Sequence, residues 1–153
     1  MHIKLAAIGE KLPLWADTAC ADYAKRIDSK WKLEIQALPL SKLHKNDPAR
    51  ATKQENDALL DASKGLFRIA LHSTGTMATS ITMAKKLDSL AMTHGKIAFL
   101  IGGPDGLLDS TLAECSQIWS LSKLTFPHAL ARVMLLEQLY RCWSMKHRIS
   151  YHR

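Results

Sequence analysis

The chain has 153 residues, a length that suits one domain, spanning residues 1–153, with a single hydrophobic core. Hydrophobic residues make up 47% and charged residues 23% of the chain, which is the globular range and excludes wholesale disorder. Lys and Arg number 21 against 14 for Asp and Glu, so the formal net charge is +7. This excess favours an anionic partner such as RNA, DNA or a phosphorylated ligand.

The positive charge is concentrated near the C-terminus. From Ser122 to Arg153 there are six basic residues and one acidic residue, Glu137. Three of the seven histidines, at positions 128, 147 and 152, lie in the same stretch. We therefore expect the C-terminal part of the chain to face the anionic partner.

The cysteines and the apolar runs indicate a cytoplasmic protein without a metal site. Cys20, Cys115 and Cys142 are widely spaced, with no CxxC and no zinc-finger spacing, which favours three reduced thiols. No signal-peptide pattern opens the chain. The longest aliphatic runs, Ile97–Ile101 and Val133–Leu136, are far shorter than the ~20 residues of a membrane helix, so no membrane contact is expected.

Strand and helix patterns alternate along the whole chain. The predicted strands are Ile3–Ile8, Leu33–Leu38, Leu66–Leu71, Ile97–Ile101 and Ile118–Leu121. The predicted helices are Trp15–Ile27, Pro48–Ser63, a segment from about residue 77 to Met92, Asp109–Ser116 and His128–Met145. Five strand–helix repeats predict an α/β fold with a mainly parallel sheet flanked by helices.

Turn and capping residues mark the boundaries of these elements. Asp47 is predicted to cap the second helix and Asp109 to cap the fourth. Ser41–Asp47 is polar and basic and is predicted to be a mobile loop, whereas Ser73–Thr76 is predicted to be a turn after the third strand.

The last helix is apolar on nearly every side, which requires burial on nearly every side. One apolar stripe contains Leu135 and Leu139, an adjacent stripe contains Val133 and Leu136, and Met134 lies on the far side. A terminal helix in a small domain packs one face on the sheet, so we expect a second face to meet another subunit in a homodimer. The alternative is that the tail after residue 145 folds back over the helix.

Three loops are expected at one edge of the sheet, because each follows the carboxyl end of a parallel strand. Ligands of open parallel sheets bind at this edge. The three loops are Leu71–Gly75, Gly102–Gly106 and Leu121–His128. The paired glycines of the second loop fit either a sharp turn or close approach of a ligand to the backbone. The chain has no Walker A loop, no dinucleotide-binding GxGxxG, no GxSxG elbow and no HExxH.

Several segments together resemble one family, the ribosomal large subunit pseudouridine N3-methyltransferases of the SPOUT class. They are Phe99-Leu100-Ile101-Gly102-Gly103-Pro104-Asp105-Gly106, Trp119-Ser120-Leu121-Ser122, Thr125-Phe126-Pro127-His128 with Arg132, Glu137-Gln138-Leu139-Tyr140-Arg141, and the ending Tyr151-His152-Arg153. The resemblance covers essentially the whole chain. It implies a C-terminal trefoil knot, a homodimer and S-adenosylmethionine bound in the knot.

The family's cofactor contacts carry over onto matching positions of this chain: Leu71, Gly102, Gly103, Leu121, Ser122, Lys123, Leu124, Thr125, Phe126 and Pro127. The resemblance implies methylation of N3 of a pseudouridine in the helix-69 loop of 23S rRNA, in the assembled ribosome. The first loop departs from the family pattern, because His72-Ser73-Thr74-Gly75 replaces the commoner Asp-x-Pro-Gly or Cys-x-Glu-Gly. The side-chain contacts expected from that loop therefore stay open.

Methylation of an imide nitrogen requires loss of its proton, so a base or a stabilised anion is needed. His128 and His152 are the candidate bases, and Tyr151 could act through its hydroxyl or stack on the target base. Arg132 and Arg141 could stabilise charge on the uracil oxygens or pair with phosphates, and Arg153 is a further candidate for RNA binding. Equally, His128 could simply begin the last helix and Arg132 could hold a dimer together.

Two other functions compete with this one. A non-enzymatic basic RNA-binding protein would not bind S-adenosylmethionine. Another SPOUT-class RNA methyltransferase acting on transfer RNA would often carry an added RNA-binding domain, for which this chain has no room. A small α/β hydrolase is disfavoured because no nucleophile motif is present.

Overall fold

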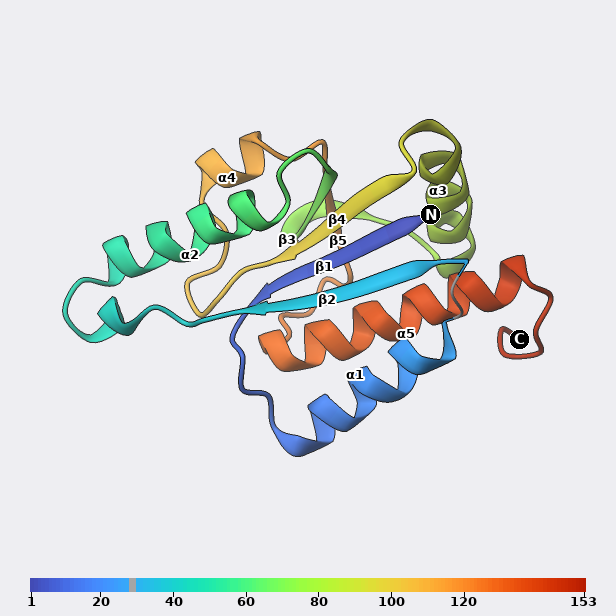
Figure 1. Ribbon diagram of the computed structural model, residues 1–153, viewed down its shortest axis with the longest axis horizontal. Helices are drawn as coiled ribbons and strands as arrows, with labels where there is room; N and C mark the ends of the chain where they lie inside the picture. The colour runs from blue at the N-terminus through green and yellow to red at the C-terminus, as the bar shows by residue number, and fades with distance from the viewer. Residues whose placement is uncertain (28–29) are drawn as a thin grey trace.

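A computed structural model describes residues 1–27 and 30–153, and its centre is a five-stranded sheet in the order β2-β1-β4-β3-β5. All four strand pairings are parallel, which confirms the predicted α/β class (Figure 1). The strands are β1 (His2–Ile8), β2 (Lys32–Leu38), β3 (Phe67–Met77), β4 (Lys96–Ile101) and β5 (Gln117–Ser120). The helices are α1 (Leu14–Arg26), the 3-10 helix η1 (Lys42–Lys45), α2 (Pro48–Ala62), α3 (Ser80–Thr93), α4 (Asp109–Ala113) and α5 (His128–Lys146).

Helices cover both faces of the sheet. Alternate side chains of β1 enter two different clusters, with Ile3 and Leu5 on one face and Ala6 and Ile8 on the other. The first cluster is closed by α1, α3 and α5, and the second by α2 and α4 (Figure 1). The central strand β4 is buried from Ile97 to Ile101 because both of its faces are covered, as its continuous apolar run predicts.

Strand β3 is longer than predicted. The predicted turn at residues 73–76 is wrong, because the backbone continues past a register shift and pairs again with β5, Thr76 opposite Trp119. Gly75 makes this possible, since a Cβ there would collide with the backbone of Trp119. The irregular stretch between Leu71 and Thr76 bends the strand where the cofactor loop was expected.

Two further local predictions need correction. The segment predicted as a mobile loop contains a 3-10 turn, η1, and the Ser41 hydroxyl caps this turn by accepting a hydrogen bond from the Leu43 amide. Helix α4 begins at Asp109 itself, so that residue is not the N-cap; the N-cap is Leu108, which makes no side-chain cap. The predicted cap of α2 is confirmed, because Asp47 accepts a hydrogen bond from the Arg50 amide.

Helix α5 is covered largely by its own chain. It packs against α1 and α3, and the tail also folds back so that Tyr151 contacts Tyr140. A stripe that includes Leu130, Met134 and Glu137 stays half-buried. The trefoil knot stays a prediction, because strand order and pairing do not define how the chain threads. No helix within residues 1–27 and 30–153 is long and apolar enough to cross a bilayer.

Candidate active site

A cavity of about 290 Å³ lies beside the register shift of β3 and the carboxyl end of β5. Two of the three loops predicted to meet there contribute most of its wall, and the third contributes Gly106. Six predicted cofactor residues line it: Leu71, Leu121, Ser122, Leu124, Thr125 and Phe126. The prediction that these separate segments form one pocket is therefore consistent with the geometry.

Four predicted cofactor residues do not line this cavity: Gly102, Gly103, Lys123 and Pro127. Three further lining residues, His72, Ser73 and Gly106, lie in the predicted loops but were not predicted cofactor residues, and Ser120 and Ala131 lie outside those loops. His72 and Ser73 lie in the register shift of β3, where the turn residues of the sequence signalled an interruption but not the return of the strand to β5 at Thr76. The His72 imidazole interacts locally, with its Nδ1 2.8 Å from the Thr74 hydroxyl.

Gly102 and Gly103, in the loop of residues 102–106, are required by close packing. Gly102 packs against the loop itself, and Gly103 packs against side chains outside it. A Cβ on Gly102 would lie 2.7 Å from the carbonyl carbon of Gly106. A Cβ on Gly103 would lie 2.5 Å from Glu55 Oε2 and 3.0 Å from Ile8 Cγ2. Both glycines therefore allow other parts of the protein to approach the backbone closely, so internal packing accounts for them without a ligand.

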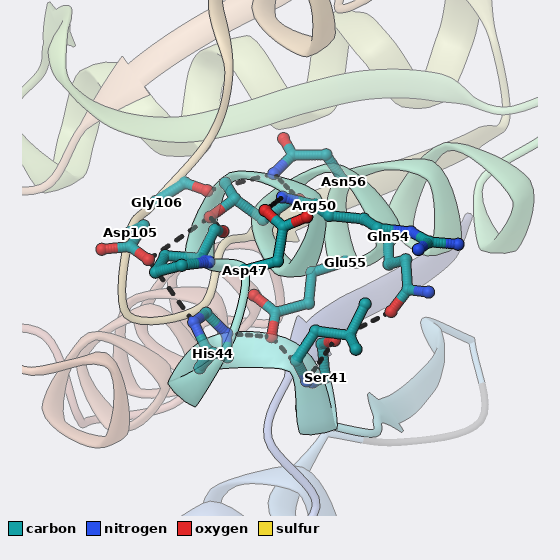
Figure 2. Close-up of polar contacts among 12 residues, drawn as sticks. Ser41, His44, Asp47, Arg50, Gln54, Glu55, Asn56, Asp105 and Gly106 are labelled. Carbon is teal, nitrogen blue, oxygen red and sulfur yellow. Dashed lines mark hydrogen bonds and ion pairs between the residues drawn. The ribbon is translucent and has the colours of Figure 1, made fainter.

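Helix α2 holds the glycine loop through three buried polar side chains that were not predicted from the sequence: Thr52, Glu55 and Asn56. Glu55 and Asn56 are labelled in Figure 2. Asn56 donates to the Gly106 carbonyl at 3.2 Å and accepts from the Leu108 amide at 3.0 Å. Polar residues at this i, i+3, i+4 spacing share one helix face, and that spacing was the available signal.

Arg132 is buried, with 2% of its surface exposed, and joins the last helix to the first strand. One guanidinium nitrogen donates to the carbonyl oxygens of Ile8 and Gly9 at 2.7 and 2.6 Å. Its Nε has no hydrogen-bond partner among the described residues. Burial lowers the pKa of Arg132 from its usual value. Two backbone hydrogen bonds give Arg132 a structural role, whatever it contributes to chemistry.

His128 is the first residue of α5 and is exposed. Its ring lies over Gly9, because a Cβ on that glycine would be 3.7 Å from His128 Nε2. An exposed imidazole close to the cavity residues Phe126 and Ala131 is free to meet a substrate. Its predicted role as a base stays a prediction.

The C-terminal tail folds back against the second half of α5. The Tyr151 hydroxyl donates to Glu137 at 3.1 Å, and its ring lies under the Arg141 guanidinium at 4.8 Å. Burial, reinforced by the hydrogen bonds to Tyr23 and Glu137, raises the pKa of Tyr151. The phenol is thus held in its protonated form, which disfavours Tyr151 as a base in this conformation.

The other predicted tail and RNA-binding residues differ in their surroundings. Arg141 donates twice to Glu137, at 2.6 and 3.0 Å, and this pairing raises its pKa. His152 Nδ1 is buried and lacks a partner within the part of the chain that the structure describes. Arg153 is exposed at the chain end. Of these, only Arg153 presents a charge not engaged by Glu137.

The cysteines are free thiols, as predicted. Burial raises the pKa of Cys20 and Cys115, and it raises that of Cys142 to about 12. A thiol protonated at neutral pH is a weak nucleophile, so cysteine-based covalent catalysis is disfavoured. In the described residues no group of three or more His, Cys, Asp or Glu side chains is arranged to hold a metal ion.

An α/β protein with a pocket built from the bent part of β3 and the loops after β4 and β5 invites comparison with known families. A family profile described as "Predicted SPOUT methyltransferase" matches residues 1–152. The chain belongs to this family of methyltransferases. It is 39% identical over 155 residues to "Ribosomal RNA large subunit methyltransferase H" of Thioalkalivibrio sulfidiphilus, with 100% of this chain and 99% of that protein covered. It is 40% identical over 154 residues to the protein of the same name from Alkalilimnicola ehrlichii, with the same coverage.

Solved structures with this fold agree. A probable methylase family protein from Haemophilus influenzae matches with a TM-score of 0.62 at 15% identity, covering 99% of this chain and 70% of that one. A probable methyltransferase from Bordetella pertussis matches with a TM-score of 0.60 at 12% identity, covering 92% and 95%. At these identities the likeness concerns the fold, and it supports the α/β class derived from the strand pattern.

Proposed function

We propose that this protein uses S-adenosylmethionine to methylate N3 of a pseudouridine in the helix-69 loop of 23S rRNA, in the assembled ribosome. The observation that carries the proposal is the convergence of Leu71, Gly106 and the segment 121–126 on one cavity. These segments are far apart in sequence, and they match the cofactor loops of the family that the chain resembles. The full-length relatives named as rRNA large subunit methyltransferases support the substrate class.

The cavity fits the proposed methyl donor. Its volume of about 290 Å³ is near the lower end of ligand pockets, roughly 300–1,000 Å³. Leu71, Leu121 and Phe126 offer apolar surface to an adenine ring, and the backbone of residues 121–126 offers hydrogen-bonding groups to its edge. When bound, S-adenosylmethionine supplies a methyl group already activated by its sulfonium.

The protein's own residues must orient the target and accept the N3 proton. His128 is exposed and lies in sequence between the cavity residues Phe126 and Ala131, so it is one candidate for the base, and His152 is the other. A neutral imidazole accepts the proton and becomes an imidazolium. Lys123 and Arg153 are exposed and are the candidates for contact with phosphates.

We further propose a homodimer whose active site combines both subunits. Helix α5 has 19 residues, which corresponds to about 28 Å. The cavity meets α5 at Ala131, whereas Tyr151 packs beside Glu137 and Tyr140, which lie about 9 and about 14 Å further along the helix. A tail that serves the cavity therefore comes from a second subunit, packed along the half-buried stripe of α5 that contains Met134. Light scattering at micromolar concentration would give a dimer mass; a monomer would contradict the proposal.

The decisive experiment is mass mapping of helix-69 nucleotides. Ribosomes that lack this modification are incubated with the protein and S-adenosylmethionine, and one pseudouridine is expected to gain a methyl group. An unmodified loop, together with calorimetric binding of the cofactor, would point to another RNA target. Absence of cofactor binding would instead favour a non-enzymatic RNA-binding protein.

A further inference from the structure

A carboxylate is buried against the glycine loop 102–106, and it is not among the residues that line the cavity. Glu55 is 2% exposed, although it carries a charge. Its Oε1 accepts from the Ser41 amide at 2.8 Å and lies 2.6 Å from His44 Nε2 (Figure 2). A buried carboxylate is costly unless it is paired and hydrogen-bonded, and here two donors compensate it.

The second oxygen of the same carboxylate faces the glycine loop. Oε2 of Glu55 lies so near Gly103 that a Cβ there would be only 2.5 Å away. The carboxylate and the Ile8 side chain therefore form the wall on which Gly103 rests. Because hydrogen bonds to Ser41 and His44 fix the rotamer of Glu55, the position of this wall is defined.

The same cluster also holds the acidic residue of the loop. His44 Nδ1 lies 3.5 Å from Asp105 Oδ2, and the Thr52 hydroxyl lies 3.3 Å from that oxygen (Figure 2). Helix α2 and η1 thus contact the loop at Gly103, Asp105 and Gly106. Gly106 is the member of this loop that lines the cavity.

We propose that Glu55, oriented by His44, is a positioning residue that sets the glycine loop against the methyl-donor cavity. This inference rests on the proposed function, because it deepens the account of the same cofactor site. Glu55 does not line the cavity; it acts through Gly103 and the loop. Misplacing a preorganised loop by a fraction of an ångström weakens the binding that depends on it.

Calorimetric titration of the full-length protein with S-adenosylmethionine tests the proposal. Glu55→Ala removes the wall and both acceptors, and it is expected to raise the Kd by about tenfold. Glu55→Gln keeps one oxygen as acceptor at nearly the same volume, and its Kd is expected to stay within about threefold of wild type. Asp57→Ala is the matched control, because this exposed acid on the same helix pairs only with Lys53 among the described residues.

Two readouts separate positioning from general stability. The amide resonances of Gly102, Gly103 and Gly106 are expected to shift in Glu55→Ala without ligand, and to stay unchanged in Asp57→Ala. In the methylation assay, Glu55→Ala is expected to raise KM for the cofactor about tenfold while kcat at saturating cofactor stays within about threefold of wild type. A folded Glu55→Ala protein with wild-type Kd would overturn the proposal.

His44→Ala provides a second route if Glu55→Ala does not fold. His44 is partly exposed, so its replacement removes one hydrogen-bond partner of the Glu55 carboxylate with less disturbance of the core. A severalfold rise in Kd is expected, smaller than for Glu55→Ala. Wild-type affinity in His44→Ala together with an unfolded Glu55→Ala would also overturn the proposal. If the wild-type protein itself does not bind S-adenosylmethionine, the proposed function fails first, and that outcome is distinct from a loss confined to the Glu55 variant.

Discussion

Arg132 donates a 2.6 Å hydrogen bond to the carbonyl oxygen of Gly9, a residue 123 positions earlier in the chain. The bond joins the first turn of the last helix to the end of the first strand. Because the guanidinium is buried, its hydrogen bonds form in a medium of low dielectric constant and are strong. The relationship gives Arg132 a structural explanation that competes with the predicted role in stabilising the uracil anion.

Arg132→Met tests the structural role. The variant keeps most of the apolar stem and leaves the carbonyl groups of Ile8 and Gly9 without their donor. An unpaired buried acceptor costs about 1–3 kcal/mol, and the bond to Ile8 is buried whereas that to Gly9 is partly buried, so we expect the free energy of unfolding to fall by about 2–4 kcal/mol in urea titrations. Arg153→Met, at the exposed chain end, is the control and should unfold like wild type. Unchanged stability with lost methylation would assign Arg132 to catalysis instead.

Gly103→Ala is expected to disturb both folding and cofactor binding. The added methyl group would collide with Glu55 and Ile8, and relief of the collision displaces the loop that contributes Gly106 to the cavity. Overpacking of this kind costs about 1–3 kcal/mol of stability. Gly65→Ala is a useful comparison, since nothing lies within 4 Å of its Cβ position; it probes only the strain of a positive φ of 75°. Equal cofactor affinity in both variants would contradict the expectation for Gly103.

The sheet followed from the sequence because its signals are local. The apolar run Ile97–Ile101 and the alternation of apolar and polar residues in β2 are patterns within a single segment. The order of strands and helices then restricts the topology. The predicted strand ends placed the three loops, and the family resemblance added the cofactor residues within them, which composition and periodicity do not identify. Those loops are the part of the site in which prediction and cavity agree best, at Leu71 and Leu121–Phe126.

The parts that the sequence did not reveal depend on contacts between distant segments. The extension of β3 past Leu71 depends on Gly75 meeting Trp119, and neither residue signals the other. The burial of Glu55 depends on η1 packing over α2. The polar and basic composition of the segment 41–47 predicts instead that it is a mobile loop. A polar residue is predicted to be exposed from the sequence alone, and this prediction fails where its side chain is buried by hydrogen bonds or ion pairs to a loop that is distant in sequence.

Phe126→Ala is expected to weaken S-adenosylmethionine binding by about tenfold or more. The ring is the largest apolar side chain of the cavity wall, and its loss removes stacking and contact area for the adenine. Met92→Ala truncates an apolar side chain that is 83% exposed and remote from the cavity, so it should bind normally. Fluorescence or calorimetric titration measures both, and wild-type affinity in Phe126→Ala would move the adenine elsewhere.

Cys142 makes stability depend on alkaline pH. Burial raises the pKa of its thiol in the folded chain to about 12, above about 8.5 in an unfolded chain. The thiol contribution is therefore complete below about pH 8.5 and is lost as the pH rises toward 12, at up to about 1.4 kcal/mol per pH unit. The free energy of unfolding should fall more steeply from pH 9 to 11 in wild type than in Cys142→Ala. Parallel curves would contradict the assignment.

Subunit mixing tests whether the tail serves the partner's cavity. One variant, Phe126→Asp, destroys the cavity by placing a charge in its apolar wall but keeps the tail. The other lacks residues 151–153 but keeps the cavity. Each is expected to be inactive alone. If dimers re-form at random from an equal mixture, half are mixed, and each mixed dimer has one complete site, so about a quarter of wild-type activity should return. A tail that acts within its own subunit would leave the mixture inactive, because no chain then carries both parts.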